Sequence, residues 1–258
     1  MTTQANRAGA AKLWLLNFVA NAAALAAWYF WLLIPDAHGW QVAGSVLLAV
    51  CVIVLVLWLR AGTLAYFRVA ALRESGAVWR AFRHSLRHLV ALALWVIVLA
   101  VVEFCLWRLR SYAPQFGVWF WQKLPGWLRI GTPRQYMQWS DWKLWFLIWM
   151  VVPAVWLPIA TTVAAAGFGQ RIRHSLRVLK RPMYWLSFCV LMLIGAYVPY
   201  KLIWWIPAVA DLRKQAWSMG LRFFAAYVIV STAWIALVWM AGIRTEREDE
   251  ITTTDLHG

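Results

Sequence analysis

Residues 41–59 read QVAGSVLLAVCVIVLVLWL, nineteen consecutive positions without a charged side chain. A helix of about 20 apolar residues is long enough to cross the hydrocarbon core of a bilayer, which is about 30 Å thick. This stretch therefore predicts a transmembrane helix. Of the 258 residues in the chain, 64% are hydrophobic and 14% are charged, whereas soluble domains are about 45–50% apolar. The composition excludes an ordinary soluble domain.

Similar apolar stretches recur along the chain. The six predicted spans are 13–34, 41–59, 89–107, 142–166, 184–206 and 217–242. The 22 Trp residues agree with this interpretation, because Trp accumulates where membrane helices meet the headgroups. The sequence predicts an all-α, polytopic membrane protein. It consists of one six-helix domain over residues 1–243 and an acidic, disordered tail over residues 244–258.

The distribution of basic residues predicts the topology. The chain carries 25 Lys and Arg against 10 Asp and Glu. If both termini and the second and fourth loops are cytoplasmic, 15 basic residues lie inside and 7 lie outside. The positive-inside bias therefore favours cytoplasmic termini, in a bacterial inner membrane. Basic loops beside apolar spans indicate contacts with anionic lipids, and no binding of nucleic acid is expected.

One pentapeptide occurs twice. RHSLR at residues 83–87 returns at residues 173–177, and each copy lies between two predicted spans. Two spans separate the copies, so we expect a parallel internal repeat with units of about 41–107 and 142–206. Each copy separates an apolar face from a basic face at helical spacing, which is typical of an amphipathic helix in the membrane interface. Four arginines are predicted to bind lipid headgroups: Arg83, Arg87, Arg173 and Arg177.

These basic segments, together with AWSMGLR at 216–222 before the last span, carry a resemblance. The chain resembles six-span bacterial membrane proteins related to the membrane domain of glycerophosphodiester phosphodiesterases, over residues 60–243. That resemblance implies a six-span fold without an assigned chemistry. The resemblance does not extend to the soluble phosphodiesterase half of that family. His38-Gly39 and His257-Gly258 lack the acidic residues and asparagine that bind its metal, so its activity is not expected here.

Charged residues inside spans are candidates for a functional site, because burying charge in hydrocarbon is costly. The four candidates are Glu103, Lys143, Lys201 and Arg222. Under the predicted topology they lie at one depth near the outer leaflet. One hypothesis is an outward-facing cavity in which Glu103 pairs with a cation and the remaining cations bind an anionic group. The alternative is that each cation extends separately to the headgroups.

The other polar or helix-bending residues of the spans and basic segments indicate helix packing and do not indicate a binding site. Asn17 and Asn21 share a face of the first span, where amides usually hydrogen-bond to a neighbouring helix. His84 and His88 have the spacing of helical metal ligands, but the arginines around them disfavour a cation, so we expect no metal and no cofactor. Pro158 and its neighbour Pro153 predict a span that is either bent or broken. No catalytic motif occurs in the sequence.

The leading functional hypothesis is a non-enzymatic membrane protein that engages an anionic lipid or amphiphile, as a small permease or an accessory of membrane homeostasis. A structural subunit of a larger membrane complex, or a homo-oligomer, is the alternative. The aromatic loop between the third and fourth predicted spans, residues 108–141, supplies a face for a partner, or else lies on the outer leaflet. A membrane enzyme with Glu103 as base is the third hypothesis.

Overall fold

The computed structural model describes residues 2–35, 37–169, 172–205 and 211–255. Every regular element in these ranges is helical, which confirms the all-α fold. The elements are α1 (Thr2–Leu32), α2 (Gly39–Arg68), α3 (Ala70–Glu74), α4 (Val78–Leu86), α5 (Leu89–Arg110), α6 (Ala113–Lys123), η1 (Gly126–Leu128), α7 (Pro133–Phe146), η2 (Leu147–Val151), α8 (Val152–Ala166), α9 (Ile172–Ser175), η3 (Leu176–Lys180), α10 (Pro182–Met192), η4 (Leu193–Tyr197), α11 (Val198–Trp204) and α12 (Leu212–Asp255).

Six helical segments are long and apolar enough to cross a membrane. They are Arg7–Leu32, Gly39–Arg68, Leu89–Arg110, Pro133–Ala166, Pro182–Trp204 and Leu212–Ile243. Each corresponds to one predicted span, and most extend further than predicted. The helix of the second span ends at Arg68 instead of residue 59, because backbone hydrogen bonding continues after the apolar run has ended.

The chain divides into two compact units instead of the expected single domain over 1–243. Unit 1 comprises Met1–Ala93 and Pro158–Gly258, and unit 2 comprises Leu94–Leu157. The division follows from local packing: α6 and α7 pack mainly on each other, whereas α2 packs on α1, α4 and α12.

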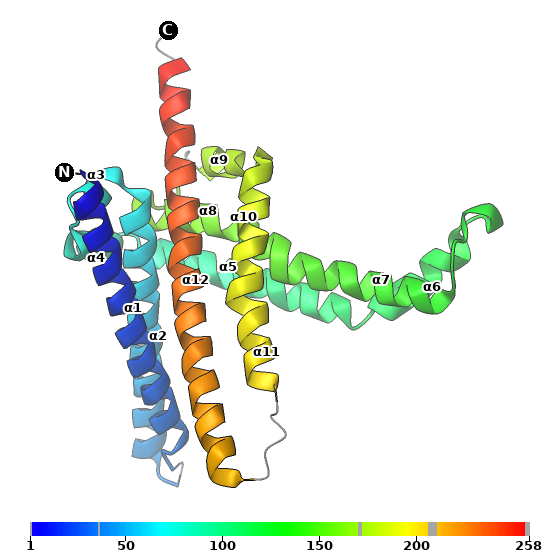
Figure 1. The fold of residues 1–258 in the computed structure, drawn as a ribbon, viewed down its shortest axis with the longest axis horizontal. Helices are drawn as coiled ribbons and strands as arrows, with labels where there is room; N and C mark the ends of the chain where they lie inside the picture. The colour runs from blue at the N-terminus through cyan, green and yellow to red at the C-terminus, as the bar shows by residue number, and fades with distance from the viewer. Residues whose placement is uncertain (1, 36, 170–171, 206–210, 256–258) are drawn as a thin grey trace. The chain divides into compact units, whose positions relative to one another are not determined.

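In unit 1, α1 lies beside α2, and α12 lies beside α10 and α11 (Figure 1). Figure 1 also shows the start of α1, the end of α12 and the short helices α3, α4 and α9 at one end of this unit. The connection between α1 and α2 lies at the opposite end. We call the first of these the basic end, because it carries both copies of RHSLR.

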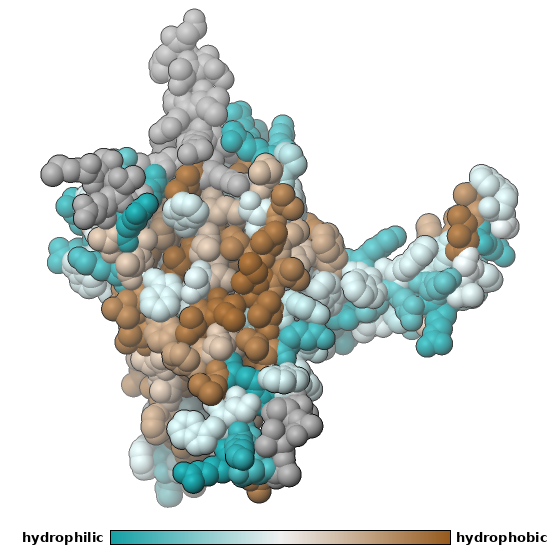
Figure 2. All heavy atoms as spheres, viewed as in Figure 1, coloured by the Kyte–Doolittle hydropathy of each residue, from teal (hydrophilic) through white to brown (hydrophobic). Residues whose placement is uncertain are grey.

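Hydropathy varies along the helices of unit 1 as a bilayer requires. Hydrophobic side chains form a band across α10 and α12, with hydrophilic groups towards both ends (Figure 2). Many large apolar side chains of the spans are exposed, such as Leu55 and Leu186 at 58% and 60%. Exposure of this kind is favourable in hydrocarbon and unfavourable in water.

Two prolines are accommodated by locally widened helix. The π-helical segments η2 and η4 each end two residues before a proline, Pro153 and Pro199. Proline has no N–H to donate to the carbonyl four residues earlier, and its ring crowds that carbonyl. A π-helical turn relieves the crowding, so the chain stays helical through both sites. The fourth span is thus continuous from Pro133 to Ala166, which excludes a broken helix there.

The aromatic segment between the third and fourth spans forms a helical hairpin in unit 2. Thr132 starts α7 with a capping box: its hydroxyl accepts from the Gln135 N–H, and its own N–H donates to Gln135 Oε1 at 2.8 Å. Gly117 of α6 lies against the backbone of Tyr136, where a methyl group would come within 2.6 Å of the carbonyl oxygen. Only glycine allows α6 and α7 to approach this closely.

The expected disordered tail is helical as far as the structure describes it. Helix α12 continues from the last span through Asp255. Extending an existing helix needs no new nucleation, so a polar continuation costs little free energy. The final residues of the predicted tail, 256–258, lie outside the described residues.

Candidate functional site

The four charged candidates of the spans are divided between the units. Glu103 and Lys143 belong to unit 2, and Lys201 and Arg222 belong to unit 1. Within the described part of the chain, the Glu103 carboxylate has no hydrogen bond or ion pair. Lys143 is exposed. The outward-facing cavity formed by all four remains a prediction.

The two cations of unit 1 each lie near an aromatic ring, Lys201 near a ring of the same helical stretch and Arg222 of α12 near the ring at the end of α11. Lys201 Nζ is 5.5 Å from the centre of the Tyr197 ring. The Arg222 guanidinium carbon is 5.9 Å from the centre of the Trp205 ring, and Arg222 Nε donates to the Ser218 carbonyl at 3.1 Å. Arg222 Nη1 also donates to the Leu202 carbonyl at 3.5 Å, so Arg222 connects α12 with α11. Lys201 is exposed, as suits a cation that extends towards a membrane surface.

Unit 2 contains an ion pair that the sequence analysis did not anticipate. Arg110 of α5 donates to Asp141 of α7 through two parallel contacts, Nε to Oδ1 at 2.7 Å and Nη2 to Oδ2 at 3.0 Å. This bidentate geometry is the strongest form of an arginine–carboxylate interaction. The pair connects the third and fourth spans.

The two copies of RHSLR share a buried serine and two exposed arginines. The serine in the middle, Ser85 or Ser175, is fully buried. Ser85 Oγ donates to the Phe82 carbonyl at 2.9 Å, and Ser175 Oγ is 2.5 Å from Thr162 Oγ1. The four predicted headgroup-binding residues are all exposed: Arg83, Arg87, Arg173 and Arg177. The copies differ in backbone, because the first lies mostly in α4 and the second passes from α9 into the 3-10 helix η3.

Packing against α2 positions α4. The Phe82 ring of α4 lies over Gly62 of α2, where a methyl group would come within 2.7 Å of the ring. Trp58 of α2 donates its indole N–H to the Phe82 carbonyl at 3.1 Å. Since Gly62 has no side chain, the ring can approach the helix backbone and bury itself.

The two histidines of α4 and its C-terminal connection contact the end of α8. His84 Nε2 lies 2.7 Å from the Ala165 carbonyl oxygen, so this nitrogen carries the proton and donates. Gly167 follows α8 with φ of 72°, and a methyl group there would lie 3.0 Å from His88 Nδ1. Among the described residues no cluster of three potential metal ligands exists.

Electrostatics at His88 favour the neutral imidazole. Burial lowers the pKa of His88 from its ordinary value of 6.5, and the neighbouring His84 and Arg87 lower it further. Desolvation and adjacent positive charge both disfavour a second cation at this position.

A polar layer crosses the interior of unit 1 between α1, α2 and α12. Arg60 Nη2 donates to Asn21 Oδ1 at 3.1 Å, and the guanidinium carbon lies 4.7 Å from the centre of the Trp234 ring. Asn17 Nδ2 donates to Thr63 Oγ1 at 2.9 Å. Both amides of the first span therefore bond to a neighbouring helix, as predicted.

Arg60 is the residue of this layer that the sequence analysis missed. The apolar run of the second predicted span ends at residue 59, which leaves Arg60 in the following loop. In the structure it lies eight residues before the end of α2, and its Nη1 is buried without a hydrogen-bond partner among the described residues. The signal available in the sequence was the small and apolar run from Ala61 to Phe67, which continues the helix.

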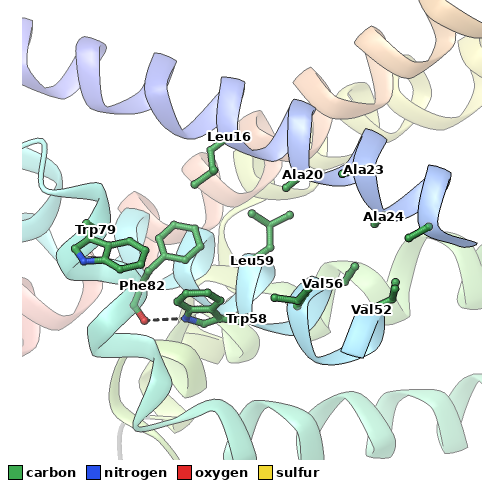
Figure 3. Close-up of a pocket in the computed structure, with 12 residues that line it drawn as sticks. Leu16, Ala20, Ala23, Ala24, Val52, Val56, Trp58, Leu59, Trp79 and Phe82 are labelled. Carbon is green, nitrogen blue, oxygen red and sulfur yellow. Dashed lines mark hydrogen bonds between the residues drawn. The ribbon is translucent and has the colours of Figure 1, made fainter. Parts of the chain in front are cut away.

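An apolar groove of about 390 Å³ opens between α1, α2 and α4 (Figure 3). Helix α1 contributes small side chains on one face, including Ala20 and Ala24, and α2 contributes Val52 and Val56 opposite them. The groove exists because alanines and valines are too short to fill the space between the two helices. Its lining is apolar apart from the indole nitrogens of Trp58 and Trp79.

The basic end of the groove is formed by α4. Figure 3 shows Trp79 and Phe82 at this end, and Ala24 and Val52 towards the other. The Arg83 guanidinium carbon lies 5.8 Å from the centre of the Trp79 ring, so a cation stands beside the mouth of the groove. Trp79 is 57% exposed, as expected for an indole at the level of the headgroups.

Comparison with known proteins adds no relative: the chain matches no family model, no curated protein sequence and no solved structure. The resemblance to the membrane domain of glycerophosphodiester phosphodiesterases stays a prediction.

Proposed function

We propose that this chain is a non-enzymatic protein of the bacterial inner membrane that binds anionic lipids at the basic end of unit 1. The observation that carries the proposal is the shared pattern of the two RHSLR copies. In each copy the serine is buried and both arginines are exposed. Arginines held in this way present their guanidinium groups to phosphate oxygens, with which they form strong charge-assisted hydrogen bonds.

The position of the helix ends and basic segments in unit 1 is consistent with this proposal. The start of α1, the end of α12 and both basic segments lie at one end of the unit (Figure 1). We propose that this end is cytoplasmic, because it collects the larger share of basic residues. Anionic lipids of the cytoplasmic leaflet attract basic residues by about 1 kcal/mol each.

Replacement of the four arginines tests the proposal. Arg83, Arg87, Arg173 and Arg177 are changed together to Gln, and the lipids that co-purify in mild detergent are measured by mass spectrometry. We expect the ratio of phosphatidylglycerol and cardiolipin to zwitterionic lipid to fall about tenfold or more. The matched control removes four exposed basic residues elsewhere: Arg108, Lys123, Arg134 and Lys214. Equal lipid profiles in the two variants would contradict headgroup binding by the repeated segments.

A structural role in a larger complex is the second candidate, favoured by the exposed aromatic face of the α6–α7 hairpin. Trp119, Phe120, Trp139 and Trp142 are each more than half exposed. Large exposed aromatic patches often mark binding surfaces for other proteins. Co-purification of one protein in fixed stoichiometry, lost when these four residues are changed to Ser, would support this role over lipid binding alone.

A further inference from the structure

We infer that the groove between α1, α2 and α4 holds one acyl chain of an anionic phospholipid whose phosphate contacts Arg83. The inference rests on the proposed function and names the lipid class and its binding site. The lipid would bind along unit 1, with its headgroup at the basic end.

The lining of the groove selects a hydrocarbon occupant. All of its lining residues are apolar or aromatic, and the Trp58 N–H already donates to the Phe82 carbonyl. Water in such a groove would find few hydrogen-bond partners. An acyl chain would contact both helices along its length and lose no polar interaction.

The length of the groove fits one leaflet. On α1 its lining runs from Leu16 to Ala27, which is about 16 Å at the rise of an α-helix. Half of a hydrocarbon core of about 30 Å is nearly the same length. A chain that enters at the basic end therefore reaches about the middle of the bilayer, as the chain of a lipid in that leaflet does.

Charge at the mouth of the groove selects an anionic headgroup. Arg83 stands over Trp79 there, and Arg80 is exposed on the same helix. Glu74 of α3 is the one acidic residue in the described parts of α1 to α4, and it is exposed. The excess of positive charge complements a phosphate, which a zwitterionic headgroup would offer only together with its own cation.

Two substitutions test the acyl-chain site and the headgroup contact separately. Ala24→Phe fills the groove, and its matched control is Leu25→Phe, because Leu25 is 62% exposed and does not line the groove. Arg83→Gln removes the cation at the mouth, and its control is Lys214→Gln, which removes an exposed cation near the start of α12, outside the basic end. The probe is phosphatidylglycerol, compared with phosphatidylcholine of the same acyl chains, and native mass spectrometry counts the bound lipid.

We expect Ala24→Phe and Arg83→Gln each to lower the tightly bound phosphatidylglycerol about fivefold, with both controls unchanged. Phosphatidylcholine should show no dependence on Arg83. Equal amounts of bound phosphatidylglycerol in Ala24→Phe and Leu25→Phe would overturn the inference that the groove binds the acyl chain. If the fourfold arginine variant loses bound phosphatidylglycerol while Ala24→Phe does not, the proposed function stands and the groove inference fails. If every variant retains the lipid, both the groove inference and the proposed function are contradicted.

A measurement on the unchanged protein covers the case in which Ala24→Phe does not fold. Phosphatidylglycerol with a photoreactive diazirine in one acyl chain is added, and the cross-linked peptides are identified. The inference expects cross-links concentrated on groove residues such as Ala24 and Val56. Labelling of exposed positions of α10 such as Leu186 to the same extent as the groove residues would overturn the inference, because that pattern is expected for lipids without a defined binding site.

Discussion

The guanidinium group of Arg60 in α2 lies over the Trp234 ring of α12, with 4.7 Å between its central carbon and the centre of the ring. No carboxylate among the described residues pairs with this buried cation. The negative face of the indole thus supplies much of its electrostatic stabilisation, together with the Asn21 carbonyl oxygen at 3.1 Å.

Trp234→Leu should therefore destabilise the protein more while Arg60 is present than after Arg60 has been replaced. A cation–π contact that is shielded from water contributes about 1–2 kcal/mol, so we expect a coupling energy of that size between Arg60→Met and Trp234→Leu. The measurement is a double-mutant cycle on unfolding in detergent. A coupling energy below about 0.5 kcal/mol would show that the two side chains only fill space.

Gly62 is predicted to be intolerant of a side chain. Gly62→Ala places a methyl group 2.7 Å from the buried Phe82 ring, so α4 must shift away from α2. Overpacking of this kind costs about 1–3 kcal/mol, and we expect a lower midpoint of thermal unfolding.

Gly44→Ala in the same helix is the matched control, because a methyl group there has no atom within 4 Å. It should leave the midpoint unchanged or raise it, since alanine favours helix more than glycine does. Similar losses in both variants would argue that general helix effects, and not the Phe82 contact, determine the result.

Sequence periodicity predicted the six spans because hydropathy depends on neighbouring residues alone. Helix ends were less predictable. At residue 60 a charge ends the apolar window, yet α2 continues to Arg68, since Trp234 and Asn21 from distant segments accommodate Arg60. A partner 174 residues away in the chain leaves no trace in a local pattern.

The groove and the ion pair of unit 2 were unpredictable for the same reason. Alanines such as Ala20 and Ala24 of the first span have helical spacing, but only the pairing of α1 with α2 turns them into a groove wall. The fourth predicted span begins at residue 142, which leaves Asp141 in the preceding loop. Its bond to Arg110 depends on how α5 and α7 meet within unit 2. The roles of Ser85 and Ser175 likewise needed the structure, since a repeated pentapeptide does not show which side chains are buried.

Loss of the Arg110–Asp141 pair should destabilise unit 2. Both contacts are short, but the side chains are 34% and 41% exposed, so solvent or headgroups screen the pair and its coupling energy should be about 1 kcal/mol at most. We expect Asp141→Asn to lower the midpoint of thermal unfolding by a few degrees. Arg108→Gln, on the same helix and without a side-chain partner among the described residues, is the control and should have little effect. A double-mutant cycle without coupling between Arg110 and Asp141 would contradict the pair.

The final prediction concerns acid sensitivity at His88. Its pKa in the folded protein lies below the ordinary value of 6.5, because of burial and then the charges of His84 and Arg87. As the pH falls through about 6.5, the unfolded chain therefore takes up a proton at this position before the folded protein does. Stability linked to the neutral imidazole is fully present above about pH 6.5 and is lost as the pH falls towards the folded pKa.

His88→Gln should reduce this acid sensitivity, because glutamine does not titrate. Unfolding midpoints are measured in detergent from about pH 7.5 down to about pH 5.5, a range in which His is the main titrating side chain. We expect the midpoint of the unchanged protein to fall more steeply than that of His88→Gln. His38→Gln is the matched control: His38 lies at the connection between α1 and α2, far along α2 from the basic end, and the pH dependence should stay as it was. Parallel curves for the unchanged protein and His88→Gln would assign the acid sensitivity to other groups, because an imidazole with a lowered pKa makes stability fall as the pH falls below about 6.5.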